Sequence, residues 1–117
     1  MRHKLLIHYI GDVARNFFID SDLPTEALLE KIFAWFNHGS GEECHMFLRD
    51  KLRSLSVNDC ILLDGQWYQC RGVGWEKITE EFVVDLEFDV IHHPDFETHG
   101  GWHCLSDVMR KKHGQLM

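Results

Sequence analysis

The sequence lacks any apolar run that approaches the roughly 20 residues needed to span a bilayer. Its N-terminus begins like a signal peptide, but the apolar stretch is short, and Asp12 and Arg15 follow it without a small-residue cleavage site. None of the four cysteines forms a Cys-x-x-Cys pair. These absences predict a cytoplasmic protein without a membrane segment, in which the cysteines are reduced thiols.

Basic residues are missing from residues 79–97, although the segment is rich in acids. It holds Glu80, Glu81, Asp85, Glu87, Asp89, Asp95 and Glu97. Acids and bases balance in the rest of the chain, so this segment accounts for the whole formal net charge of −7. A surface of one sign steers association. The first five of these acids therefore form the predicted surface for a protein partner with a basic patch.

A length of 117 residues fits a single domain, 1–117. Short β-prone apolar runs predict strands at residues 3–10, 16–20, 60–63 and 66–71. Helical spacing of apolar residues predicts a helix that opens at 21–25, with an inner stripe of Leu28, Leu29, Ile32, Phe33 and Phe36. The same spacing predicts two more helices, at Thr79–Ile91 and at Trp102–His113. The first of these has Phe82, Val83, Leu86 and Val90 facing inward. Residues 44–52 fit either a strand or a helical turn.

This order of elements predicts an α+β fold: a small antiparallel sheet or partly open barrel with about three helices on one side. The strongest local signal is Asp64-Gly65 between two apolar runs, which favours a two-residue type I′ turn with positive φ at Gly65. Leu63 then pairs with Gln66, and Cys60 lies opposite Gln69. Cys70 points to the other face of the sheet, which disfavours a disulfide or shared metal with Cys60.

Histidines are frequent, yet we expect no cofactor and no metal. The best local group of ligands is His99, His103 and Cys104, but Gly100-Gly101 interrupts a helix between the two histidines. The group remains the site to test if a metal is found.

Two alternatives to a binding role remain open. An enzyme with a Cys or His centre would need a nucleophile beside a base, and the neighbours Cys44 and His45 would point apart in a strand. A nucleic-acid-binding surface would use the central bases and a nearby aromatic residue, namely Arg49, Lys51, Arg53, Trp67 and Arg71.

Residues 33–78 carry a recognisable pattern. Its markers are Asn37-His38-Gly39-Ser40-Gly41, Phe47-Leu48, Arg53-Ser54-Leu55-Ser56-Val57-Asn58-Asp59, Gly65, Tyr68, Cys70 and Gly74-Trp75. The pattern resembles a group of small plasmid- and bacteriophage-associated proteins that share RS-(L/M)-SVGD, DG-x-x-Y-x-C and GW. Asn58 replaces the glycine of that pattern, and Asn tolerates a left-handed backbone. The turn is also similar to one in PUA-like and ASCH barrels, which implies RNA binding.

No catalytic set converges in this sequence, and the resemblance brings no activity or catalytic residue with it. We therefore predict a non-catalytic binding protein of mobile-element origin that recognises another protein. Nucleic acid is the second choice of partner, and the sequence does not indicate an oligomeric state.

Overall fold

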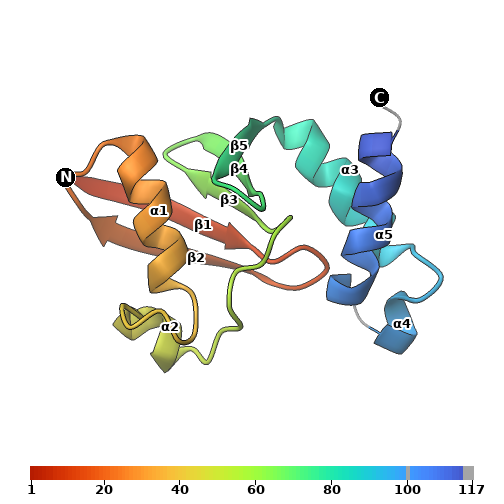
Figure 1. The fold of residues 1–117 in the computed structure, drawn as a ribbon, viewed down its shortest axis with the longest axis horizontal. Helices are drawn as coiled ribbons and strands as arrows, with labels where there is room; N and C mark the ends of the chain where they lie inside the picture. Colours follow the sequence, from red (N-terminus) through yellow and green to blue (C-terminus); the bar gives the residue numbers. More distant parts are fainter. Residues whose placement is uncertain (100, 115–117) are drawn as a thin grey trace.

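The computed structural model describes the backbone of residues 1–99 and 101–114, and the side chains of residues 1–98 and 104–112. Five strands form one open antiparallel sheet in the order β2-β1-β3-β4-β5 (Figure 1). They are β1 (Arg2–His8), β2 (Ala14–Asp20), β3 (Cys60–Leu63), β4 (Gln66–Cys70) and β5 (Trp75–Ile78). The sheet keeps two free edges, at β2 and β5, and does not close into a barrel.

Five helices accompany the sheet in the described part of the chain: α1 (Thr25–Trp35), α2 (His45–Arg49), α3 (Glu80–Ile91), α4 (Phe96–His99) and α5 (Gly101–Gly114). The predicted α+β class is confirmed, and the three long helices are the predicted ones. Residues 44–52 contain the short helix α2, while β5 and α4 were not predicted. No described helix combines the length and apolar character that crossing a membrane would require.

The predicted hairpin is confirmed in turn and register. Asp64 and Gly65 both have positive φ, 49° and 87°, as a type I′ turn requires. Leu63 pairs with Gln66, and Cys60 lies opposite Gln69. Because side chains alternate along a strand, Cys60 and Cys70 point to opposite faces of the sheet.

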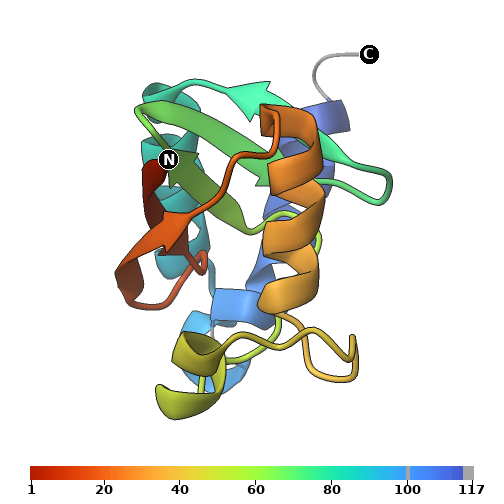
Figure 2. The same ribbon diagram turned by 90° about the vertical axis from the view of Figure 1, so that its left-hand side faces the viewer.

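The helices lie on both faces of the sheet, so the expectation that they share one side is wrong. One core contains Leu5, Ile7, Ile61 and Tyr68 together with the buried face of α1. A second core contains Cys60 and Trp67 from the opposite face, packed against α3 and α5. Figure 2 looks along the molecule from the N-terminal end and shows α1 near the viewer, with α3 and α5 behind.

Helix α3 begins and ends where the sequence predicts. Thr79 is its N-cap, and the hydroxyl of Thr79 accepts a hydrogen bond of 3.1 Å from the Phe82 amide. His92 is its C-cap residue. Of the expected inner stripe, Val83, Leu86 and Val90 are buried, and Phe82 is half-buried against the second core. The acidic helix is therefore held to the body of the protein by its apolar side.

Candidate functional site

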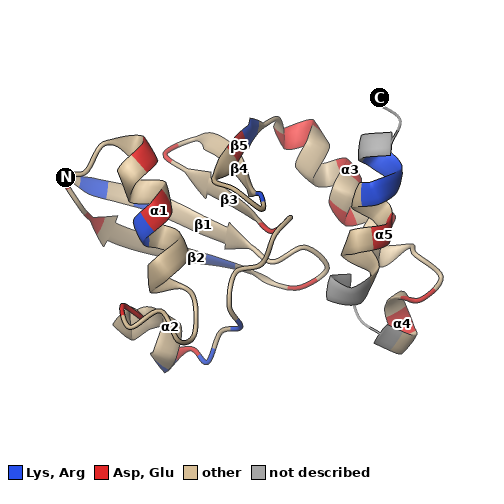
Figure 3. Cartoon of the chain, in the orientation of Figure 1, with Lys and Arg blue, Asp and Glu red and all other residues tan. Residues whose placement is uncertain are grey.

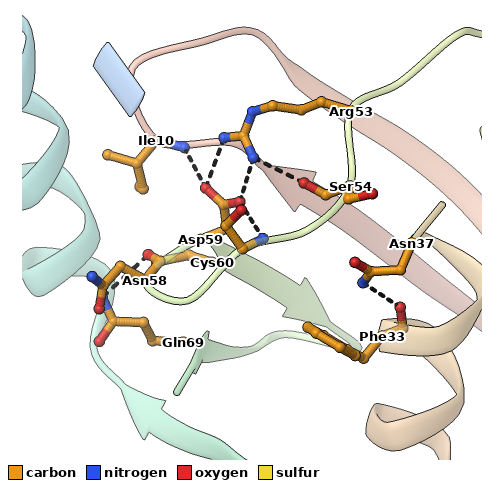
Figure 4. Close-up of polar contacts among 10 residues, drawn as sticks. Ile10, Phe33, Asn37, Arg53, Ser54, Asn58, Asp59, Cys60 and Gln69 are labelled. Atoms are coloured by element: carbon orange, nitrogen blue, oxygen red, sulfur yellow. Dashed lines mark hydrogen bonds and ion pairs between the residues drawn. The ribbon is translucent and has the colours of Figure 1, made fainter. Parts of the chain in front are cut away.

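Arg53 and Asp59, from the loop between α2 and β3, form a buried ion pair (Figure 4). The Asp59 side chain is 0% exposed and that of Arg53 is 30% exposed. Two guanidinium nitrogens of Arg53 donate to the Asp59 carboxylate at 2.7 and 2.9 Å. The same carboxylate accepts from the amides of Ser56 at 2.9 Å and Ile10 at 3.3 Å. Four donors thus satisfy a carboxylate that burial alone would penalise.

This ion pair holds a turn and a strand end in place. The Asp59 amide donates to the Ser56 carbonyl at 3.0 Å, and Asn58 has φ of 82° within that turn. The predicted tolerance of Asn58 for a left-handed backbone is confirmed. The bond to Ile10 links the turn to the end of β1, and the Arg53 guanidinium lies 4.5 Å from the centroid of the Tyr9 ring. These contacts tie the turn before β3 to the end of β1.

The remaining residues of the predicted nucleic-acid surface do not form one exposed cationic patch. Arg49 pairs with Asp50 at 2.8 Å, and Arg71 pairs with Glu76 at 2.7 Å. Lys51 is exposed and has φ of 52° just after α2. Trp67 is half-buried, packs against the second core and meets the His8 ring edge-on at 6.1 Å. Arg49 and Arg71 are thus paired with carboxylates, while Lys51 makes no ion pair with the described residues.

The four cysteines are free, and three of them are buried. Burial raises the pKa of the Cys70 thiol to about 12 and raises the pKa values of the Cys60 and Cys104 thiols as well. A raised pKa opposes formation of the thiolate nucleophile. Cys44 is half-buried against the first core, and His45 beside it is exposed. The structure shows no hydrogen bond between the side chains of these two neighbours, which belong to the described residues.

The group to test if a metal is found, His99, His103 and Cys104, lies partly outside the described side chains. The side chains of His99 and His103 lie outside the described residues, and Cys104 is buried. A different group, His93, Asp95 and Asp107, has possible ligand atoms within 4.8 Å of one another. The Asp95 amide donates to Nδ1 of His93 at 3.2 Å, and Nε2 of His93 lies 3.8 Å from the Asp107 carboxylate.

The acids of α3 fall into two groups: some bond to other described residues, and some do not. Figure 3 shows α3 with acidic residues and no basic ones. Glu87 accepts from the Gly11 amide at 2.8 Å and contacts His8 at 3.1 Å, which ties α3 to the sheet. Asp89 pairs with Lys112 of α5 at 2.9 Å. Glu80, Glu81 and Asp85 are exposed and make no ion pair with any described residue.

An apolar stripe runs along the outer side of α3, between these acids. Val84, Phe88 and Ile91 are 59%, 57% and 40% exposed. They recur at i, i+4 and i+7, so they lie on one face, about 140° around the helix axis from the buried Val83, Leu86 and Val90. The prediction from sequence missed this second stripe, although its spacing was readable. An acidic helix face with an apolar centre is the candidate functional site.

The fold and this surface define a small α+β protein with an open antiparallel sheet and a two-faced acidic helix. The chain matches no protein-family model, and no curated protein or solved structure is significantly similar to it.

Proposed function

We propose that the protein is a non-catalytic binding protein whose helix α3 recognises a protein partner carrying a basic patch. The observation that carries this proposal is the set of three exposed acids, Glu80, Glu81 and Asp85, which make no ion pair with the described residues and lie beside an exposed apolar stripe. Charges without internal partners remain available to an external one, and a surface of one sign increases the rate of encounter with the opposite sign.

A cytoplasmic setting and a mobile-element origin belong to the same proposal. The four free cysteines support a reducing compartment. The likeness of residues 33–78 to small plasmid and phage proteins supports the origin. Plasmid or phage genes on both sides of the coding sequence would be the expected genomic setting.

The test uses an oligolysine peptide as probe, titrated into ¹⁵N-labelled protein. The largest shifts are expected at amides of residues 80–91, and affinity should fall as ionic strength rises toward about 0.15 M, where the Debye length is about 8 Å. Neutralising Glu81→Gln together with Asp85→Asn should abolish most of the binding.

The matched control is Glu26→Gln together with Asp20→Asn. Glu26 lies in the first turn of α1 as Glu81 does in α3, and Asp20 is an exposed aspartate far from α3. Equal weakening by both pairs would mean that only net charge matters, and it would overturn the assignment to α3.

A further inference from the structure

The outer stripe of α3 has a defined shape as well as a charge. Phe88 lies at its centre, with Val84 one turn before it and Ile91 nearly one turn after it. The His92 ring stacks on the Phe88 ring with centroids 4.0 Å apart and an interplanar angle of 24°. Nδ1 of His92 is held by the Phe88 carbonyl at 2.9 Å. The His92 ring, held by this bond, packs against the exposed Phe88 ring and restrains it, and such restraint lowers the entropy cost of binding.

The charges beside the stripe exclude several occupants. Glu80 and Glu87 lie along one side of it, while Glu81 and Asp85 lie along the other. Pairing with α3 of a second copy would bring these acids together with no base on either helix to compensate. Anionic lipid headgroups and phosphate backbones would meet the same repulsion.

We infer that the partner presents a basic amphipathic helix, whose apolar ridge lies lengthwise on Val84, Phe88 and Ile91 and whose Lys or Arg residues face Glu80, Glu81 and Asp85. This inference rests on the proposed function and specifies the kind of segment bound. Apolar residues three and four apart on one helix form a ridge that fits the groove of another, which is how amphipathic helices recognise helical surfaces. The acids on both sides of the stripe then favour a partner helix with basic residues beside its apolar ridge.

The experiment compares two synthetic peptides of the same composition. One, of about 18 residues, carries leucines at alternating three- and four-residue spacing with lysines between them, long enough for about five helical turns. The other is a scrambled peptide that keeps the composition and loses the stripe. Binding is followed by fluorescence anisotropy, and peptide helicity by circular dichroism.

The patterned peptide should bind and gain helicity. Phe88→Ser should weaken its binding about ten- to a hundredfold, because a buried Phe side chain contributes an amount of this size. Val84→Ser should weaken it less. Phe18→Ser and Val73→Ser are the matched controls, since Phe18 is 55% exposed on β2 and Val73 is exposed in the β4–β5 loop, and both should leave the affinity unchanged.

Three other outcomes would contradict the inference in different ways. If the scrambled peptide bound equally well and Phe88→Ser had no effect, helix docking would be wrong while the charge-based function would stand. If neither peptide nor oligolysine bound, both would fail. If sedimentation showed a dimer that Phe88→Ser dissolved, the stripe would be an interface between two copies of this chain.

Discussion

Two charged regions of this protein differ in how the fold uses their charges. In the segment from Arg53 to Asp59, opposite charges bond to each other, and the carboxylate is fully buried. On α3, Glu81 and Asp85 face water and make no ion pair with the described residues. The comparison shows that a charge indicates an external partner only where the fold has not already supplied an internal one.

The sharpest way to test this difference is to remove one buried carboxylate. Asp59→Asn keeps the size of the side chain but leaves the half-buried Arg53 guanidinium without its counter-charge. We expect a loss of about 3–5 kcal/mol in the free energy of unfolding, as for other broken buried pairs. Urea denaturation measures it. Asp85→Asn on α3 is the control and should change stability by less than about 0.5 kcal/mol. Equal effects of the two variants would mean that the buried pair is not structural.

The two apolar stripes of α3 allow the same comparison within one helix. Leu86 is fully buried, so Leu86→Ala should lower the free energy of unfolding by about 2–5 kcal/mol, through lost burial and a remaining cavity. Phe88→Ala removes a larger but exposed side chain and should cost less than about 0.5 kcal/mol. A thermal or urea unfolding curve for each variant decides the point. A large loss for Phe88→Ala would show that its ring supports the fold and is not spare surface.

The sequence predicts those parts of the fold that local chemistry determines. The Asp64-Gly65 turn, the Thr79 cap and the extent of α3 depend on residues close to each other in the chain, and all three are confirmed. Strand β5 was missed because it is an edge strand, Trp75–Ile78, with no buried residue and no apolar alternation. Its pairing with β4 is what makes it a strand.

The sequence predicts the candidate site only in part, for a related reason. The acids of α3 and its buried stripe are readable, but the exposed stripe of Val84, Phe88 and Ile91 was missed, because a second apolar face could equally have been covered by another part of the chain. The contacts of Glu87 with His8 and Gly11 span more than 70 residues and hold the helix against the sheet. The role of Asp59 depends likewise on the distant Ile10 amide. Such long-range contacts carry no local signal.

A histidine–carboxylate pair, His3 and Asp64, makes a smaller contribution to stability, and this contribution depends on pH. Nδ1 of the buried His3 bonds to Asp64, and Nε2 faces the Ser21 carbonyl at 3.2 Å, so the protonated ring can donate on both sides. The bond to Asp64 raises the pKa of His3 above 6.5, and the bond from His3 lowers the pKa of Asp64 below 3.8. The His3 contribution to stability is complete below pH 6.5 and is lost as pH rises through the folded-state pKa. The Asp64 contribution is present above pH 3.8 and is lost as pH falls.

His3→Gln tests this pair. The variant should lower the free energy of unfolding by about 1 kcal/mol near pH 5.5, a modest value because Asp64 is half exposed. At about pH 9 the difference between the variant and the parent protein should shrink, because the neutral His3 ring carries a single N–H for its two acceptors, the Asp64 carboxylate and the Ser21 carbonyl. Urea midpoints at the two pH values provide the measurement. His45→Gln, at an exposed histidine, is the control and should leave the pH dependence unchanged. A constant difference at both pH values would contradict the charged bond.

The smallest effect is expected where the sequence suggested nucleic-acid binding. Arg49, Arg53 and Arg71 are each paired with a carboxylate, which weakens their ability to release counterions from phosphates. The acidic face of α3 adds repulsion. We therefore expect weak or absent binding of random single- or double-stranded nucleic acid at physiological salt, measured by fluorescence anisotropy.

Any weak binding at low salt should be little changed by Lys51→Ala with Arg49→Ala. These two exposed residues are the appropriate test. Arg53→Ala would leave the buried Asp59 carboxylate without its counter-charge and destabilise the fold, so that lost binding could not be told from lost stability. Sub-micromolar affinity that the Lys51 and Arg49 changes removed would instead show a nucleic-acid surface around these two residues and contradict this expectation.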